Sequence, residues 1–295
     1  MKKIAILGSE NSHCMLFAST FAPKDGKKLF EDIELLGVYG DPNEPGMAEG
    51  NEGVAKNSAC KVFADDKDAF LEEADAIMVT ARNGSNHLKY ARNYIKKGIP
   101  VWMDKPVTGS VSEVMELLEL ADKHGAIISG GSSLEYTPTV KKFAQIAQEK
   151  KGEIIGGHVT AQISMVNPYG NFWFYAQHLV SMVVTVFGMD VKSVCAIKTE
   201  TGVHAIYKYD GFEVSAFFGT GFSVSLYTSS HELISEAFDL TSDFYMPEVE
   251  SFYNVMKTGK PDKTKKEYIT PIYVIEATVK AYESGKEIAI EIPKI

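Results

Sequence analysis

Short apolar runs alternate with helical patterns along the first 131 residues of the chain. Most of these runs lack polar alternation, which is typical of strands covered on both faces of a parallel sheet. They span Ile4–Leu7, Ile33–Tyr39, Lys61–Phe63, Asp75–Thr80, Pro100–Met103 and Ala126–Ser129. Strands that alternate with helices indicate right-handed βαβ units. Residues 1–131 therefore predict an α/β Rossmann domain with a doubly wound parallel sheet.

The clearest helical pattern in this part spans Val111–His124, where apolar residues recur every three or four positions. Ser110 precedes it and Glu113 follows three residues later, the spacing of a capping box. We expect this helix to begin directly after Ser110.

After Gly130-Gly131 the apolar runs become longer and more closely spaced. They span His158–Met165, Val191–Lys198, Ala205–Tyr209, Glu213–Phe218 and Phe222–Thr228. The Asp210-Gly211 dipeptide between two of them is a strong hairpin signal. Helices are expected around Asp243–Thr258 and Pro271–Ser284. Residues 132–295 therefore predict an α+β domain with a large, mostly antiparallel open sheet and helices on one face.

Composition limits the classes of partner. The formal net charge is -9, which argues against binding to nucleic acid or to an anionic membrane surface. No segment is long and apolar enough for a transmembrane helix. The three cysteines lie far apart and form neither a zinc spacing nor a disulfide framework, so no metal is expected and a cytoplasmic location fits best.

The stretch "NHLKYARNYIKKGIPVWMDKPVTGSVSEVMELLELADKHGAIISGG" resembles the Gfo/Idh/MocA oxidoreductases, in which a helix bearing His precedes a strand that ends in Glu-Lys-Pro. Here the tripeptide is Asp104-Lys105-Pro106, a conservative departure. The tail "ESGKEIAIEI" is similar to the closing helix and strand of the family. The resemblance implies the two domains predicted above, a small-molecule substrate of the sugar or polyol class, and a homodimer or homotetramer that pairs through the open sheet.

A glycine-rich phosphate loop is expected after the first strand, at "ILGSENSHC", but only Gly8 is present. Glu10 and His13 occupy the second and third glycine positions of G-x-G-x-x-G. The phosphates of a dinucleotide lie on backbone N–H groups at a helix N-terminus, and Asn11 and Ser12 are good caps and donors. Glu10 adds an unfavourable negative charge, whereas the His13 imidazole could donate to a phosphate. The alternative is that Glu10 and His13 are solvated loop residues in a fold that has lost its ligand.

Asp41 follows the second predicted strand, where a carboxylate accepts hydrogen bonds from the adenosine ribose hydroxyls. It would repel a 2′-phosphate, and no Arg or Lys follows closely, so NAD is favoured over NADP. The alternative is that Asp41 serves only the turn at Gly40-Asp41-Pro42-Asn43. The resemblance implies further cofactor contacts from Thr80, Asp104 and His87, although His87 could instead simply pack.

Lys105 stands at a strand's carboxyl end, where open α/β sheets bind ligands. In the family this lysine lies near the nicotinamide and the substrate, where an ammonium stabilises a developing alkoxide. Asp104 could hold and orient it. The alternative is a surface lysine before a turn.

The family's second catalytic element is a helix with D-x-x-x-H, which places both side chains on one face. This chain keeps His178 as the acid/base, but Phe174 stands at the Asp position. Tyr175 could supply the missing polar group. Trp173, with the phenylalanines on either side of it, could form an apolar wall against a sugar ring, or these aromatic residues could be core packing. His178 itself could be a satisfied buried histidine.

Glu135 stands where many family members carry a basic residue, which would favour hydroxyl or amine substrates over acids, unless it is only a surface residue. We therefore predict an NAD-dependent oxidoreductase that acts on a sugar, polyol or related hydroxyl compound. The alternative is a catalytically inactive nucleotide- or sugar-binding sensor on the same fold.

Overall fold

The computed structural model describes residues 1–22, 27–57, 60–63, 70, 73–240 and 244–294. It divides into two compact units. The first contains Met1–Gly131, together with Pro168–Gly170 and Val249–Lys263, and the second contains the remaining residues. Two segments that lie far along the sequence therefore return to the first unit, which no pattern in the sequence had indicated.

The first unit is built on a parallel six-stranded sheet with the order β3-β2-β1-β4-β5-β6. Its strands are β1 (Lys2–Leu7), β2 (Ile33–Tyr39), β3 (Val62–Phe63), β4 (Ala76–Val79), β5 (Val101–Met103) and β6 (Ile128–Gly130). The strand order reverses between β1 and β4, and open α/β sheets bind their ligands at the carboxyl ends of the strands at such a point. The predicted Rossmann sheet is confirmed.

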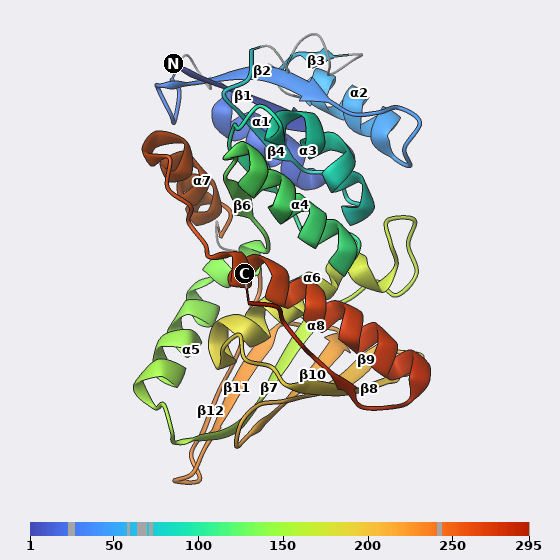
Figure 1. Ribbon diagram of the computed structural model, residues 1–295, viewed down its shortest axis with the longest axis vertical. Helices are drawn as coiled ribbons and strands as arrows, with labels where there is room; N and C mark the ends of the chain where they lie inside the picture. Colours follow the sequence, from blue (N-terminus) through green and yellow to red (C-terminus); the bar gives the residue numbers. More distant parts are fainter. Residues whose placement is uncertain (23–26, 58–59, 64–69, 71–72, 241–243, 295) are drawn as a thin grey trace. The chain divides into compact units, whose positions relative to one another are not determined.

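Helices connect these strands (Figure 1). They are α1 (Ser12–Phe21), α2 (Met47–Asn57), α3 (His87–Ile95) and α4 (Val111–His124), with a short 3₁₀ turn, η1 (Gly84–Asn86), before α3. Apolar side chains from α1 pack on β1, β2 and β5, with Phe17 edge-on to Trp102 at 4.9 Å between ring centroids. The C-terminal part of α7 (Met246–Thr258) completes this core through Val249, Phe252 and Val255.

The second unit is built on a seven-stranded sheet with the order β12-β11-β7-β10-β9-β8-β13. Its strands are β7 (Ile154–Gln162), β8 (Ser193–Lys198), β9 (Val203–Lys208), β10 (Glu213–Gly219), β11 (Ser223–Thr228), β12 (Leu233–Ala237) and β13 (Ile288–Ala289). All neighbouring pairs are antiparallel except β7 and β10. Buried and exposed residues alternate along β9 and β10, as expected for a sheet covered on one face.

Helices α5 (Pro138–Glu149), α6 (Phe172–Phe187) and α8 (Lys265–Ser284) pack on this sheet, with the turn η2 (Ser133–Tyr136) before α5 (Figure 1). The predicted hairpin joins β9 to β10, and Tyr209 N–H donates to Phe212 O across it. The mostly antiparallel open sheet predicted for this part of the chain is confirmed.

Several predicted boundaries were wrong. Helix α8 begins at Lys265 because Thr264 and Glu267 form a reciprocal capping box, so Pro271 lies inside the helix. The sequence "TKKE" carried that signal. Strand β12, whose burial pattern shows no residue fully inside, was missed. Asp243, the expected start of α7, lies outside the described residues, and the helix begins at Met246.

The capping box predicted before α4 is only half formed. The Ser110 hydroxyl accepts from the Glu113 N–H at 3.2 Å, but the Glu113 carboxylate accepts from Gly109 N–H at 2.8 Å rather than from Ser110. In the described part of the chain, no helix is long and apolar enough to cross a membrane.

Candidate functional site

The turn after β1 is held against the end of β4. Gly8 has a φ of 98°, and a Cβ there would lie 2.4 Å from the Ala81 nitrogen, so only glycine fits. The fully buried Thr80 hydroxyl donates to Gly8 O, and Thr80 N–H donates to Leu7 O at 2.7 Å. Thr80, predicted as a cofactor contact, therefore holds the loop in place through its own hydrogen bonds.

A buried carboxylate ties the same loop to the end of β5. Asp104 is 1% exposed and its oxygens meet Asn11 Nδ2 at 2.7 Å, His13 Nδ1 at 2.8 Å and Lys105 N–H at 2.7 Å. A carboxylate with three donors can be buried at acceptable cost because its charge is compensated by strong hydrogen bonds. His13 at the third glycine position thus uses Nδ1 for Asp104. The Asp104 carboxylate holds Lys105 by accepting a hydrogen bond from the Lys105 backbone N–H.

Glu10, at the second glycine position, is also buried. Its Oε1 accepts from Arg82 N–H at 2.7 Å, and Oε2 has no partner among the described residues. Desolvation raises the pKa of this carboxyl group, although the Arg82 N–H and the Arg82 charge oppose the shift, and the nearby Glu44 adds to it. The Arg82 guanidinium in turn bonds the Tyr169 hydroxyl at 3.2 Å and lies over its ring. Glu10 is therefore built into the loop and is not a solvated side chain.

The start of α1 fits the phosphates of a dinucleotide. The Asn11 side chain caps the helix by accepting from His13 N–H at 3.2 Å, and Cys14 N–H bonds Asn11 O. The N–H groups of Asn11 and Ser12 meet no acceptor within the described chain, and they lie at a helix N-terminus, where backbone donors and the helix dipole favour an anion. Glu10 in its ionised form opposes such an anion, and in its protonated form it does not.

Asp41 makes the turn contacts that the sequence analysis gave as the alternative to a role in cofactor binding. Its Oδ1 accepts from the backbone and side chain of Asn43 at 3.1 and 2.9 Å, and these bonds lower its pKa. Lys89 of α3 lies 3.6 Å from Asp41 and 3.3 Å from Glu44. The sequence showed no cation close to Asp41 because Lys89 reaches it only through the fold.

His87 is fully buried at the start of α3. Its Nε2 lies 2.6 Å from Ala81 O and its Nδ1 lies 3.2 Å from Val107 O. Burial lowers the pKa of this imidazole, which favours the neutral ring. Both nitrogens face backbone carbonyls that follow β4 and β5, so this geometry favours the packing alternative over contact with nicotinamide.

Lys105 follows β5 in the first unit and is 3% exposed. It is therefore not the surface lysine that the sequence left open. The predicted partner His178 belongs to α6 in the second unit. That the two nitrogens flank one substrate stays a prediction.

His178 is 8% exposed, and its Nδ1 lies 2.8 Å from the Ser132 hydroxyl. The Tyr175 ring lies beside the imidazole, with 5.7 Å between centroids, and the Phe174 ring contacts Tyr175 at 4.4 Å. The half-exposed Glu135 lies in η2, the turn that begins directly after Ser132. Sequence reasoning missed Ser132, because a serine 46 positions before the histidine gives no local signal.

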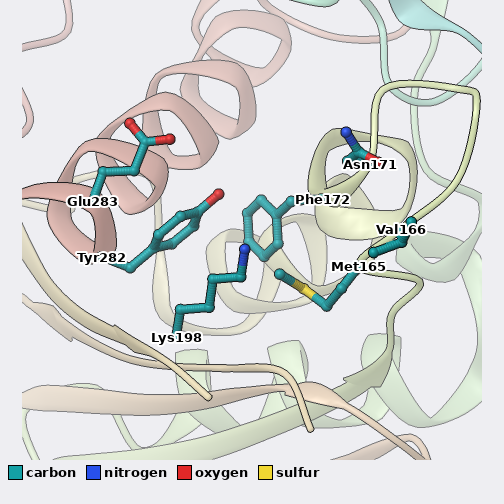
Figure 2. Close-up of a pocket in the computed structure, with 7 residues that line it drawn as sticks. All are labelled: Met165, Val166, Asn171, Phe172, Lys198, Tyr282 and Glu283. Carbon is teal, nitrogen blue, oxygen red and sulfur yellow. The ribbon is translucent and has the colours of Figure 1, made fainter. Parts of the chain in front are cut away.

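The predicted aromatic wall is divided between two faces of α6. At 100° per residue, Phe172 points about 160° away from Phe174. Phe172 packs on Phe218 and Tyr282, at 4.9 and 5.6 Å between centroids. It also lines a pocket of about 540 Å³ that Met165, Val166, Asn171, Lys198, Tyr282 and Glu283 complete (Figure 2). His178 does not line this pocket, so Phe172 packs apart from Phe174, and the partly exposed Trp173 remains a candidate for the predicted wall.

Comparisons with known proteins agree with the resemblance. Residues 3–132 match the model of the Gfo/Idh/MocA oxidoreductase family with its NAD-binding Rossmann fold, so this part of the chain is similar to the NAD-binding domain of that family. The family match supports an NAD-dependent oxidoreductase. A comparison with curated protein sequences finds no match.

Solved structures share the fold along nearly the whole chain. GenD2 from gentamicin A biosynthesis, in complex with NAD, is 13% identical with a TM-score of 0.81 and covers 99% of this chain and 97% of its own. Myo-inositol 2-dehydrogenase from Lactobacillus plantarum is 15% identical with a TM-score of 0.79, covering 98% and 99%. The WlbA dehydrogenase from Chromobacterium violaceum, with NADH and UDP-GlcNAcA, is 15% identical with a TM-score of 0.76, covering 99% and 97%.

Proposed function

We propose that this protein transfers hydride between NAD and a hydroxyl-bearing carbon of a sugar, polyol or related compound. The observation that carries the proposal is the buried Asp104, which accepts from Asn11, His13 and Lys105. These bonds keep the N-terminus of α1 and the residue after β5 together at the carboxyl edge of the sheet. A loop that had simply lost its ligand would not need a buried, fully bonded carboxylate there.

NAD, when bound, supplies the hydride acceptor. Asn11 and Ser12 would hold its phosphates through their backbone N–H groups, and Asp41 would accept from its adenosine ribose. The Lys105 ammonium would stabilise negative charge on the substrate oxygen as hydride leaves the carbon. His178 would exchange a proton with that oxygen, with Tyr175 in support. Trp173 and Glu135 would contact the rest of the substrate.

Two variants test these roles. We expect Lys105→Ala to leave NAD affinity nearly unchanged and to lower turnover about 10²-fold or more, because the lysine stabilises charge that develops in the transition state. His178→Ala should lower turnover roughly 10²- to 10⁴-fold, the usual range for a positioned acid/base. Reduction of NAD is followed by absorbance with a panel of polyols and sugars, and NAD affinity by calorimetry. Variants with wild-type turnover would refute the assignment.

NAD rather than NADP is our proposed cofactor, since the Asp41 carboxylate would repel a 2′-phosphate. The Lys89 ammonium would attract a 2′-phosphate, but the two negative charges of Asp41 and Glu44 outweigh its single positive charge. Asp41→Ala should therefore narrow the preference for NAD, and Lys89→Ala should widen it. Equal or tighter binding of NADP by the wild type, measured by calorimetry, would contradict the proposal.

We also propose that the protein forms a homodimer or homotetramer in the cytoplasm through the uncovered face of the second sheet. Ile197, Ile206 and Tyr227 on its strands are 69%, 44% and 40% exposed. Large apolar side chains gathered on one face are typical of an interaction surface. Light scattering after gel filtration tests the mass, and a monomer at micromolar concentration would exclude this arrangement.

A sensor without catalysis is the second candidate. It is favoured by the buried Glu10 carboxylate in the phosphate loop and by Phe174 at the position of the family Asp. A protein that binds NAD or a sugar but transfers no hydride to any compound tried, and in which Lys105→Ala weakens binding instead of turnover, would support this candidate.

A further inference from the structure

The contact between Ser132 and His178 lies inside the second unit, and the other hydrogen bond of the Ser132 hydroxyl limits which of the two side chains can be the donor. Ser132 is fully buried, and its hydroxyl oxygen accepts from Leu134 N–H at 3.3 Å as the cap of η2. The same hydroxyl lies 2.8 Å from His178 Nδ1. Within the described chain, Nδ1 is the only acceptor that the hydroxyl hydrogen reaches.

A buried hydroxyl hydrogen without an acceptor is costly, so the hydrogen bond should run from Ser132 to Nδ1. A neutral imidazole that accepts at Nδ1 carries its own proton on Nε2. We propose that Ser132 is a positioning residue for His178: it fixes the ring and keeps the neutral ring in the tautomer with the proton on Nε2. This inference rests on the function proposed above, because it describes how the acid/base is held.

The chemistry of the partner explains why a serine suits this position. A carboxylate only accepts hydrogen bonds, so it would favour a proton on Nδ1. A hydroxyl donates to Nδ1 in the resting ring and accepts from Nδ1–H once the ring is protonated on both nitrogens. Ser132 can therefore stay bonded through a cycle of proton exchange at Nε2, and it does so without adding a charge beside the apolar Phe174 and Tyr175 rings.

The experiment reads the ring nitrogens directly. Protein with ¹⁵N-labelled histidine is studied by NMR at a pH above the titration of the ring, and the His178 signals are assigned by their loss in His178→Gln. The wild type should show the proton on Nε2. Ser132→Ala should show a mixture of tautomers and a turnover about tenfold lower with KM within about twofold. Ser132→Thr keeps the hydroxyl and should restore the wild-type spectrum and rate.

Ser133→Ala is the matched control, because Ser133 is buried in the same turn and its hydroxyl has no partner among the described residues. It should leave the spectrum and the rate unchanged.

A wild-type ring with its proton on Nδ1, or a Ser132→Ala spectrum equal to that of Ser133→Ala, would overturn the proposal. Thermal melting shows whether Ser132→Ala is folded. If it is not, the proposal requires that Ser132→Thr and Ser133→Ala both give the wild-type spectrum, and it fails if either differs. If the wild type transfers no hydride, only the proposed function is refuted. The NMR spectra still show whether Ser132 sets the tautomer of His178.

Discussion

The loop after β1 and the helix α6 both depart from the sequence pattern of the family, and the two regions compensate differently. In the loop, the residues that replace glycine are polar: Glu10 and His13 are buried, and His13 Nδ1 meets the Asp104 carboxylate at 2.8 Å. On α6, the apolar Phe174 stands at the position of the family carboxylate, and the Nδ1 atom of His178 meets the neutral hydroxyl of Ser132 at 2.8 Å.

The comparison suggests that the residue standing at a family motif position, polar in the loop and apolar on α6, depends on whether its surroundings can stabilise a charged side chain. The loop lies at the carboxyl edge of a parallel sheet, where backbone N–H groups can stabilise a carboxylate. Helix α6 is mostly buried, and Phe174 lies there against the Tyr175 ring, where an unpaired carboxylate would be costly. We therefore expect charge substitutions to have opposite consequences in the two regions.

Removing the Asp104 carboxylate, to which the loop is bonded, should have the largest effect on stability. Asp104→Ala leaves Asn11, His13 and Lys105 N–H without their shared acceptor, and breaking such a buried set costs about 3–5 kcal/mol. Urea unfolding measures the free energy. Glu73→Ala, which removes an exposed ion pair with Lys3, is the control and should change stability little. Equal losses in the two variants would show that the Asp104 bonds contribute nothing special.

Adding the family charge to α6 should be the next largest effect. Phe174→Asp removes a buried ring, whose truncation alone costs about 3 kcal/mol or more, and buries a carboxylate beside His178, whose Nδ1 already bonds Ser132. Phe174→Leu keeps the position apolar and should cost less than about 1.5 kcal/mol. The free energy of unfolding of both variants decides the point. If the aspartate is tolerated as well as the leucine, α6 can solvate a charge and the contrast with the loop disappears.

The smallest effect expected is on Glu10 and depends on pH. Because burial raises the pKa of Glu10, its contribution to stability is present at pH below the ordinary glutamate value and is lost as the pH rises through the raised value. Glu10→Gln should therefore stabilise the protein by about 1 kcal/mol near pH 7 and hardly at all near pH 4. It should also tighten NAD binding by roughly 3- to 10-fold, since a negative charge beside the phosphates is removed.

Melting temperatures across this pH range and NAD titrations test the Glu10 prediction. Glu116→Gln is the control, because the Arg92 guanidinium lowers the pKa of Glu116 and the sign of its pH dependence is reversed. A Glu10→Gln variant that is less stable than the wild type at neutral pH would mean that the bond from Arg82 N–H outweighs the cost of burial.

Much of the fold was predictable from local patterns. Apolar runs and helical spacing located every strand of the first sheet within a few residues, and the central strands left the clearest trace because they are buried on both faces. Strand β12 left no such trace, because it lies at the edge of its sheet and none of its residues is fully buried. The start of α8 was misjudged because Pro271 outweighed the capping signal at Thr264.

The sequence by itself determined which residue types stand at the ends of strands β1 and β5 and on α6, and from these the class of chemistry to expect. The tertiary structure decided which of them contact one another. His13 and Asp104 are 91 positions apart, and Ser132 and His178 are 46 apart. Side chains so distant in sequence meet only because strands and helices carry them to the same place, and hydrogen bonds depend on distances of a few ångströms that no local pattern encodes.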